Sequence, residues 1–246
     1  MNLQMMVYIS LLAFLGLILG GVLGGVVNKA VKQVNKLYVY SGALVLGIIL
    51  FEIVPESSKT FDWIGVSISV LIGLVLMHQI HLLTESLQAK LSKTRAISFA
   101  TVFLVVAIAI HNLPSGIAIS SNSVNQNLSN EIIFSFVIHQ IPEGLALFLS
   151  LVSVGSAFYS IISFVSLSLF LVLCFFLALL LGEQTLFQDN RLRAIFMGVS
   201  IGTLSYVSVV ELIMRSFNKL RLGQFIPSFC LGIITILFFI QFVQAH

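Results

Sequence analysis

The chain has 246 residues, of which 59% are hydrophobic and 9% charged, and its mean hydropathy is +1.11. Soluble domains carry about 25% charged residues on average, so this composition excludes an ordinary soluble protein. The formal net charge is +3, and its basic residues cluster between apolar stretches. Such a distribution indicates membrane topology and gives no reason to expect nucleic acid as a partner.

Apolar stretches long enough to cross a bilayer recur along the whole chain. A helix of about 20 apolar residues spans the hydrocarbon core. The sequence predicts eight such spans, at 6–27, 37–54, 63–83, 96–120, 131–152, 157–181, 192–214 and 225–243. Because the connections are short, we expect one transmembrane domain over residues 1–246, of the all-α integral membrane class and surrounded by the lipid bilayer.

Lysine and arginine lie mainly in alternate loops, which predicts the orientation of the chain. Nine of the twelve basic residues follow the first, third and seventh spans: Lys29, Lys32, Lys36, Lys90, Lys93, Arg95, Arg215, Lys219 and Arg221. Cytoplasmic loops accumulate such residues. With an even number of spans, both termini are therefore expected outside, in a multi-pass protein of the cell membrane.

One motif occurs twice, 28 residues apart. HNLPSGIAI at residues 111–119 matches HQIPEGLAL at residues 139–147 in its histidine, amide, proline, glycine and aliphatic positions. The two motifs lie in the fourth and fifth spans, which run antiparallel, so they approach each other from opposite directions. This pattern is typical of an inverted repeat with a binding site near the midplane. Pro114 and Pro142 predict a kink in each span.

Three ionisable residues lie inside these two spans. His139 and Glu143 are four residues apart and share a helix face, and His111 lies in the facing span. Ionisable groups in the hydrocarbon core are costly and mark candidate sites. Imidazole with carboxylate suits Zn²⁺ and other first-row divalent ions better than Mg²⁺ or Ca²⁺. We therefore predict a metal site, with zinc as the first candidate and iron and manganese behind it. These residues could instead form hydrogen bonds that only stabilise helix packing, but the repetition of the motif in two antiparallel spans favours the metal site.

Polar neighbours extend this predicted site. Asn112 and Gln140 follow the two histidines and offer carbonyl oxygens or positions for ordered water. Ser115 stands four residues after His111, where the second motif has Glu143.

The two motifs, HNLPSG and HQIPEG, resemble the HNxPEG and HxxPEG motifs of the ZIP family of zinc and iron transporters, and FEIVPES at residues 51–57 resembles the acidic end of that family's second helix. The resemblance implies uptake toward the cytosol by alternating access, with the divalent ion as transported substrate, no resident cofactor and no enzymatic activity. It implies that His111, His139 and Glu143 are first-site ligands and Asn112 a second-site ligand. It also implies that spans 1, 4, 5 and 6 move against the rest.

The sequence departs from the family pattern at two positions. Ser115 replaces the glutamate of the first motif, and Gln140 stands where many members have a carboxylate or an amide. With Glu143 as the single central carboxylate, we expect one bound ion, completed by water.

Other polar residues lie near the ends of the spans. His78, His81 and Glu85 share a face at the cytoplasmic end of the third span, where solvated interfacial residues are favoured over an exit site. Glu52 and Glu211 are candidates for the outer entrance and the inner exit, with interfacial anchoring an equal alternative.

Two alternative functions and one possible assembly remain open. Histidines beside a carboxylate also suit an intramembrane metal-dependent hydrolase, although no HExxH run is present. Ser115 also allows a metal-sensing protein that does not transport. The glycine stripes Gly16, Gly20, Gly24 and Gly198, Gly202 predict close helix packing, with a homodimer contact as the alternative.

Overall fold

The computed structural model describes residues 1–30, 33–90, 99–121, 129–152, 157–184 and 189–244. All regular structure in these ranges is helical, which confirms the expected all-α class. Lys32, Lys93 and Arg95, which contributed to the predicted orientation, lie outside the described residues.

Eight long helices cross the described part of the molecule, and two of them contain a π-helical segment. In chain order the elements are α1 (Leu3–Ala30), α2 (Val34–Ile48), η1 (Ile49–Ile53), α3 (Val54–Thr60), α4 (Trp63–Lys90), α5 (Phe99–Ser121), α6 (Ser129–Val152), α7 (Ala157–Gly182), α8 (Asn190–Tyr206), η3 (Val207–Met214), α9 (Arg215–Phe217) and α10 (Leu222–Gln244). The segments α2, η1 and α3 follow one another without a break, as do α8, η3 and α9.

Membrane-spanning character is clearest in five of these helices, which are long and apolar enough to cross a bilayer. They are α1, α2 with η1, α4, α7, and α8 with η3 and α9. The helices α5, α6 and α10 have shorter apolar stretches, at Leu104–Ile117, Phe136–Val152 and Leu222–Phe238.

Several helices extend beyond the predicted spans. The third was expected to end at residue 83 but α4 continues to Lys90, and the second was expected to end at 54 but continues through α3 to Thr60. Hydropathy marks the edge of the hydrocarbon layer, whereas a helix can continue into the polar interface. The helix also continues through Pro114 in α5 and Pro142 in α6, so the kinks stay a prediction.

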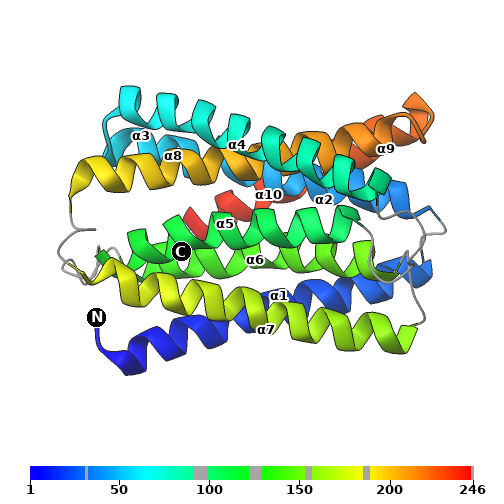
Figure 1. Ribbon diagram of the computed structural model, residues 1–246. Coiled ribbons are helices and arrows are strands. Elements are labelled where there is room, and N and C mark those ends of the chain that lie inside the picture. Colours follow the sequence, from blue (N-terminus) through cyan, green and yellow to red (C-terminus); the bar gives the residue numbers. More distant parts are fainter. Residues whose placement is uncertain (31–32, 91–98, 122–128, 153–156, 185–188, 245–246) are drawn as a thin grey trace.

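The helices that carry the repeated motif lie in the middle of the bundle (Figure 1). α1 and α7 pack on one side of α5 and α6, and α8 and α4 lie on the other side. α2 contacts α6 and packs extensively against α10. The chain starts at the left end in Figure 1, and α10 runs back toward that end.

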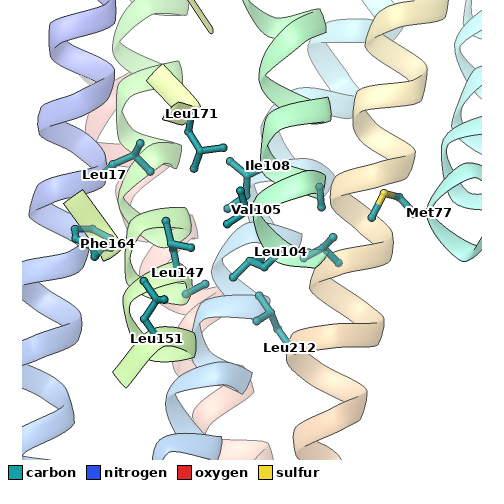
Figure 2. Packing of buried hydrophobic residues seen from close by; sticks show 13 residues of the cluster. Leu17, Met77, Leu104, Val105, Ile108, Leu147, Leu151, Phe164, Leu171 and Leu212 are labelled. Carbon is teal, nitrogen blue, oxygen red and sulfur yellow. The ribbon is translucent and has the colours of Figure 1, made fainter. Parts of the chain in front are cut away.

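Two apolar clusters enclose the middle of α5 and α6. The larger cluster joins residues of α1, α4, α5, α6, α7 and η3, and Figure 2 shows its packing around Leu104, Ile108 and Leu147. A second cluster contains Ile119 of α5 and Phe136 of α6, together with residues of α1 and α7. Along both helices the repeated motif residues therefore lie between two apolar layers.

The glycine stripes face neighbouring helices of the same chain. A Cβ atom on Gly16 would lie 2.6 Å from the carbonyl oxygen of Val137 in α6, and one on Gly198 would lie 2.5 Å from that of Val66 in α4. Both are far inside van der Waals contact. The stripes therefore allow α1 to approach α6 and α8 to approach α4. They are not open to a second copy, and the homodimer stays a prediction.

Candidate metal centre

The two copies of the repeated motif meet residue by residue where α5 crosses α6. His111 Nε2 lies 3.3 Å from His139 Nε2. One position further along, the Gln140 amide donates a hydrogen bond to Asn112 Oδ1 at 3.3 Å. Each pair joins equivalent positions of the repeat, 28 residues apart. Because equivalent residues of the two helices contact each other, a local two-fold axis relates α5 to α6 at the crossing, as in an inverted repeat.

The three predicted ligands come together in this crossing. Ligand atoms of His111, His139 and Glu143 all lie within 4.8 Å of one another. Glu143 Oε1 is 3.8 Å from His111 Nε2, and both side chains are 2% exposed. Two nitrogen ligands of a tetrahedral zinc ion, each about 2.0–2.1 Å from the metal, lie about 3.3–3.4 Å apart. The spacing of the two histidine nitrogens therefore fits a shared ion.

Glu143 places a carboxyl group in the interior of the bundle. Neither of its carboxylate oxygens has a hydrogen-bond partner within the described part of the chain, and both are buried. A buried carboxylate without compensation is strongly disfavoured. A divalent cation held jointly with the two histidines would supply that compensation, so the donor set fits a metal ion.

The polar neighbours have different surroundings. Asn112 and Gln140 are each 1% exposed, and Gln140 Oε1 is buried without a hydrogen-bond partner among the described residues. The Ser115 hydroxyl donates to the backbone carbonyl of His111 at 3.2 Å. The amides therefore continue the polar patch across the crossing, while the Ser115 hydroxyl is engaged by its own helix.

Two serines from other helices complete the surroundings of the motif. Ser200 of α8 contacts Nδ1 of His111 and donates to the carbonyl oxygen of His111 at 3.3 Å. Ser41 of α2 donates to the carbonyl oxygen of Pro142 at 3.1 Å. Sequence reasoning missed both residues, because a serine in an apolar helix carries no local signal for a contact with a distant helix.

Aromatic side chains cover His139 on one side. The ring of Phe136 meets that of His139 edge-on, with centroids 4.9 Å apart. Phe136 in turn stacks on Phe175 of α7 at 4.3 Å. Both phenylalanines belong to the second apolar cluster, so this side of the centre is closed by apolar contacts.

Two residues that the sequence offered as separate exit candidates form one cluster. Glu211 of η3 lies 3.0 Å from His81 Nδ1 of α4 and 3.0 Å from the Arg215 guanidinium. Glu211 and Arg215 also line a cavity of about 190 Å³, together with Asn35 and Tyr38 of α2. The spacing of four residues between Glu211 and Arg215 was a signal for their pairing that the sequence interpretation did not use.

The remaining predicted residues lie away from the metal centre. His78 contacts the Tyr206 hydroxyl at 3.3 Å and is exposed. Glu85 is on α4, and its side chain lies outside the described residues. Glu52 is half-buried in η1. The structure does not bring His78 or Glu52 into the group formed by His111, His139 and Glu143.

Comparison with known protein families gives a match over most of the chain. The family model described as ZIP zinc transporter matches residues 77–240, about two thirds of the chain. This range contains both copies of the repeated motif, Ser200, and the cluster around Glu211. A search of the curated proteins finds no match.

Proposed function

Because this chain belongs to the ZIP zinc transporter family, whose members are divalent metal transporters, we propose that it takes up zinc through the centre between α5 and α6. Iron and manganese are the next candidates, since histidine and carboxylate ligands suit all three ions. The ion moves toward the cytosol, and the protein alternates between arrangements in which the centre is open to one side.

The observation that carries this proposal is the buried group of His111, His139 and Glu143. Two neutral imidazoles and one carboxylate give a divalent ion a formal net charge of +1. A second ion beside it would meet further repulsion without a second carboxylate, so one ion binds at a time, with water completing its shell. Incomplete neutralisation also favours release, which transport requires as much as capture.

The inner end of the molecule holds a partly polar cavity, whose lining also includes Leu104 and Leu212 of the larger apolar cluster. The cavity lined by Glu211, Arg215 and Asn35 is bordered by helix ends that carry basic residues, which belong on the cytoplasmic side. His81 reaches the same carboxylate. We assign this cluster to the exit, and Glu52, near the opposite end of the bundle, to the entrance.

Helix contacts support a division into two bundles. In the first bundle, α1 packs on α6 and α7, and α5 packs on α7. In the second bundle, α4 packs on α8, and α2 packs on α10 and η3. Contacts between the bundles are made mainly by α5 with α8 and by α2 with α6. The first bundle, which carries the metal centre, moves against the second during transport.

Metal uptake by purified protein in liposomes tests the proposal. The parent protein should accumulate zinc, and His139→Ala and Glu143→Ala should reduce uptake to the level of empty liposomes. Ser208→Ala is the matched control, since it removes a buried hydroxyl from the second bundle. Iron, manganese and counter-ion flux are measured in the same vesicles. Equal uptake by the parent and both ligand variants would show that His139 and Glu143 do not bind the transported ion.

A further inference from the structure

One ligand of the proposed centre is held by a residue of the opposite bundle. The Ser200 hydroxyl on α8 touches Nδ1 of His111 on α5 and is 3.3 Å from the carbonyl oxygen of the same residue. Ser200 and His111 are each 1% exposed, so water does not compete for this hydroxyl. The contact therefore fixes one side of the His111 ring.

The two contacts of Ser200 together determine which ring nitrogen of His111 is free. A hydroxyl carries one hydrogen atom, and the Ser200 hydroxyl has the carbonyl oxygen of His111 as its acceptor. The hydroxyl oxygen is then left to accept a hydrogen bond from Nδ1–H. A neutral imidazole has a single N–H group, so Nε2 carries the lone pair. Nε2 is the atom that faces His139 and Glu143.

We propose that Ser200 is a positioning residue that holds His111 in the tautomer with Nδ1 protonated and so presents Nε2 to the metal ion. Histidine ligands in metal sites are commonly oriented in this way through their second nitrogen, and loss of such a partner costs about 10- to 100-fold in metal affinity. Ser200 does not touch the ion. It acts through His111.

The position of Ser200 adds a consequence for transport, which rests on the proposed function. Ser200 belongs to the second bundle, where Gly198 and Gly202 hold α8 closely against α4. His111 belongs to the first bundle. A displacement of α5 along α8 breaks the hydrogen bond and frees the ring of His111. The centre therefore binds metal most tightly in the present arrangement and more weakly once the bundles have shifted.

The tautomer is measured without metal, by nitrogen-15 NMR of the histidine rings in the full-length protein. Subtraction of the His111→Asn spectrum assigns the His111 signals. The parent should show a protonated Nδ1 and a bare Nε2, whereas Ser200→Ala should show a mixture of tautomers. A parent spectrum with Nε2 protonated, or identical spectra for the parent and Ser200→Ala, would overturn the proposal, whatever the outcome of the uptake assay.

Metal affinity supplies the second readout, with zinc titrated into the same proteins. Ser200→Ala should bind about 10-fold more weakly or worse, Ser200→Thr should recover most of the affinity because it keeps the hydroxyl, and Ser208→Ala should match the parent. Unchanged affinity in Ser200→Ala would contradict the proposal. If the parent has the expected tautomer but binds no zinc, the proposed function fails while the role of Ser200 in fixing the ring stands.

Discussion

Ser115 and Glu143 occupy the same position in the two copies of the motif and make the centre asymmetric. Two other pairs of equivalent polar residues meet across the crossing, histidine with histidine and amide with amide. At this position one helix supplies a carboxylate and the other a hydroxyl bonded to its own backbone. The charge of the centre therefore depends on Glu143.

Replacing Glu143 by glutamine should separate metal binding from folding. With zinc at about 100 times its Kd, the parent should gain about 2.7 kcal/mol of stability, seen as a higher melting temperature. Glu143→Gln should show no zinc-dependent rise. Without metal it should be at least as stable as the parent, because a neutral amide replaces a buried carboxylate that lacks hydrogen bonds.

The matched control for this experiment is Glu183→Gln. Glu183 is 39% exposed and pairs with the N-terminal ammonium of Met1, far along the chain from the motif. This variant should keep the zinc-dependent rise. A full rise in Glu143→Gln would show that the carboxylate is not a ligand.

Restoring the second carboxylate should change the number of bound ions. Ser115→Glu places an acid at the position equivalent to Glu143, and we expect the metal content to increase from one ion per protein to two. Ser115→Ala removes the hydroxyl alone and should still bind one. Metal analysis after equilibrium dialysis checks both. A sharp gain in uptake by Ser115→Glu would indicate that the serine limits transport. An unchanged metal content in Ser115→Glu would contradict the proposal that the single carboxylate limits the centre to one ion.

Among the helices, close approach at glycine decides how the motif helices pack. Gly116 lies within the first motif on α5, where it faces Phe175 and Ala178 of α7. Gly144, its equivalent on α6, faces Leu17 of α1. The repeated glycines thus place the same kind of helix contact on each side of the crossing, and this contact explains why both motifs contain one.

Gly116→Ala should therefore destabilise the protein. The added Cβ would lie 2.6 Å from the Cβ of Ala178 and 3.0 Å from the carbonyl oxygen of Phe175, and overpacking of this kind costs about 1–3 kcal/mol. Gly223→Ala is the control, because a Cβ at Gly223 meets no atom within 4 Å. It should leave stability unchanged or raise it slightly, since alanine favours helix. Unfolding in detergent with denaturant measures both; equal stability of the two variants would contradict the packing argument.

The two π-helical segments each contain one of the glutamates proposed for the transport route. Glu52 lies in η1 and Glu211 in η3, so both glutamates proposed for the ends of the route occur where the helix is wider than an α-helix. Such segments are frequent at functional sites. An extra residue in a turn rotates the following side chains to another face, and this rotation alters the faces expected from a regular 3.6-residue period.

At the scale of the whole molecule, apolar layers lie on both sides of the metal centre. Phe136 and Phe175 close one side of the metal centre, and on the other side the wall of the cavity beside Glu211 includes Leu104 and Leu212 of the larger apolar cluster. The cavity lies toward the end of the bundle where the basic residues gather, which the sequence predicts to be the cytoplasmic end.

Cysteine accessibility tests this orientation, in a background where Cys174 and Cys230 are replaced by serine. Asn35→Cys lines the cavity and should react with a membrane-impermeant maleimide only from the cytoplasmic side. Gln184→Cys lies exposed beyond the end of α7, at the opposite end of the bundle, and should react only from outside. The reverse pattern would invert the predicted topology.

The sequence by itself determined the membrane class, the helical fold, the repeated motif and its three ligand candidates. These features depend on local chemistry: the apolar length that a bilayer requires, the spacing that puts His139 and Glu143 on one helix face, and the cost of an ionisable group in hydrocarbon. The family match supports the resemblance drawn from the two motifs. None of these inferences required knowledge of how distant helices pack.

The tertiary structure decided the contacts between helices that are far apart in the chain. Ser200 is 89 residues from His111, and His81 meets Glu211 from a different helix. A periodic pattern shows which face of a helix is polar or small, but the neighbour on that face is chosen by the packing of the whole bundle. The ligand candidates were therefore predictable, whereas the hydroxyl that orients one of them was not.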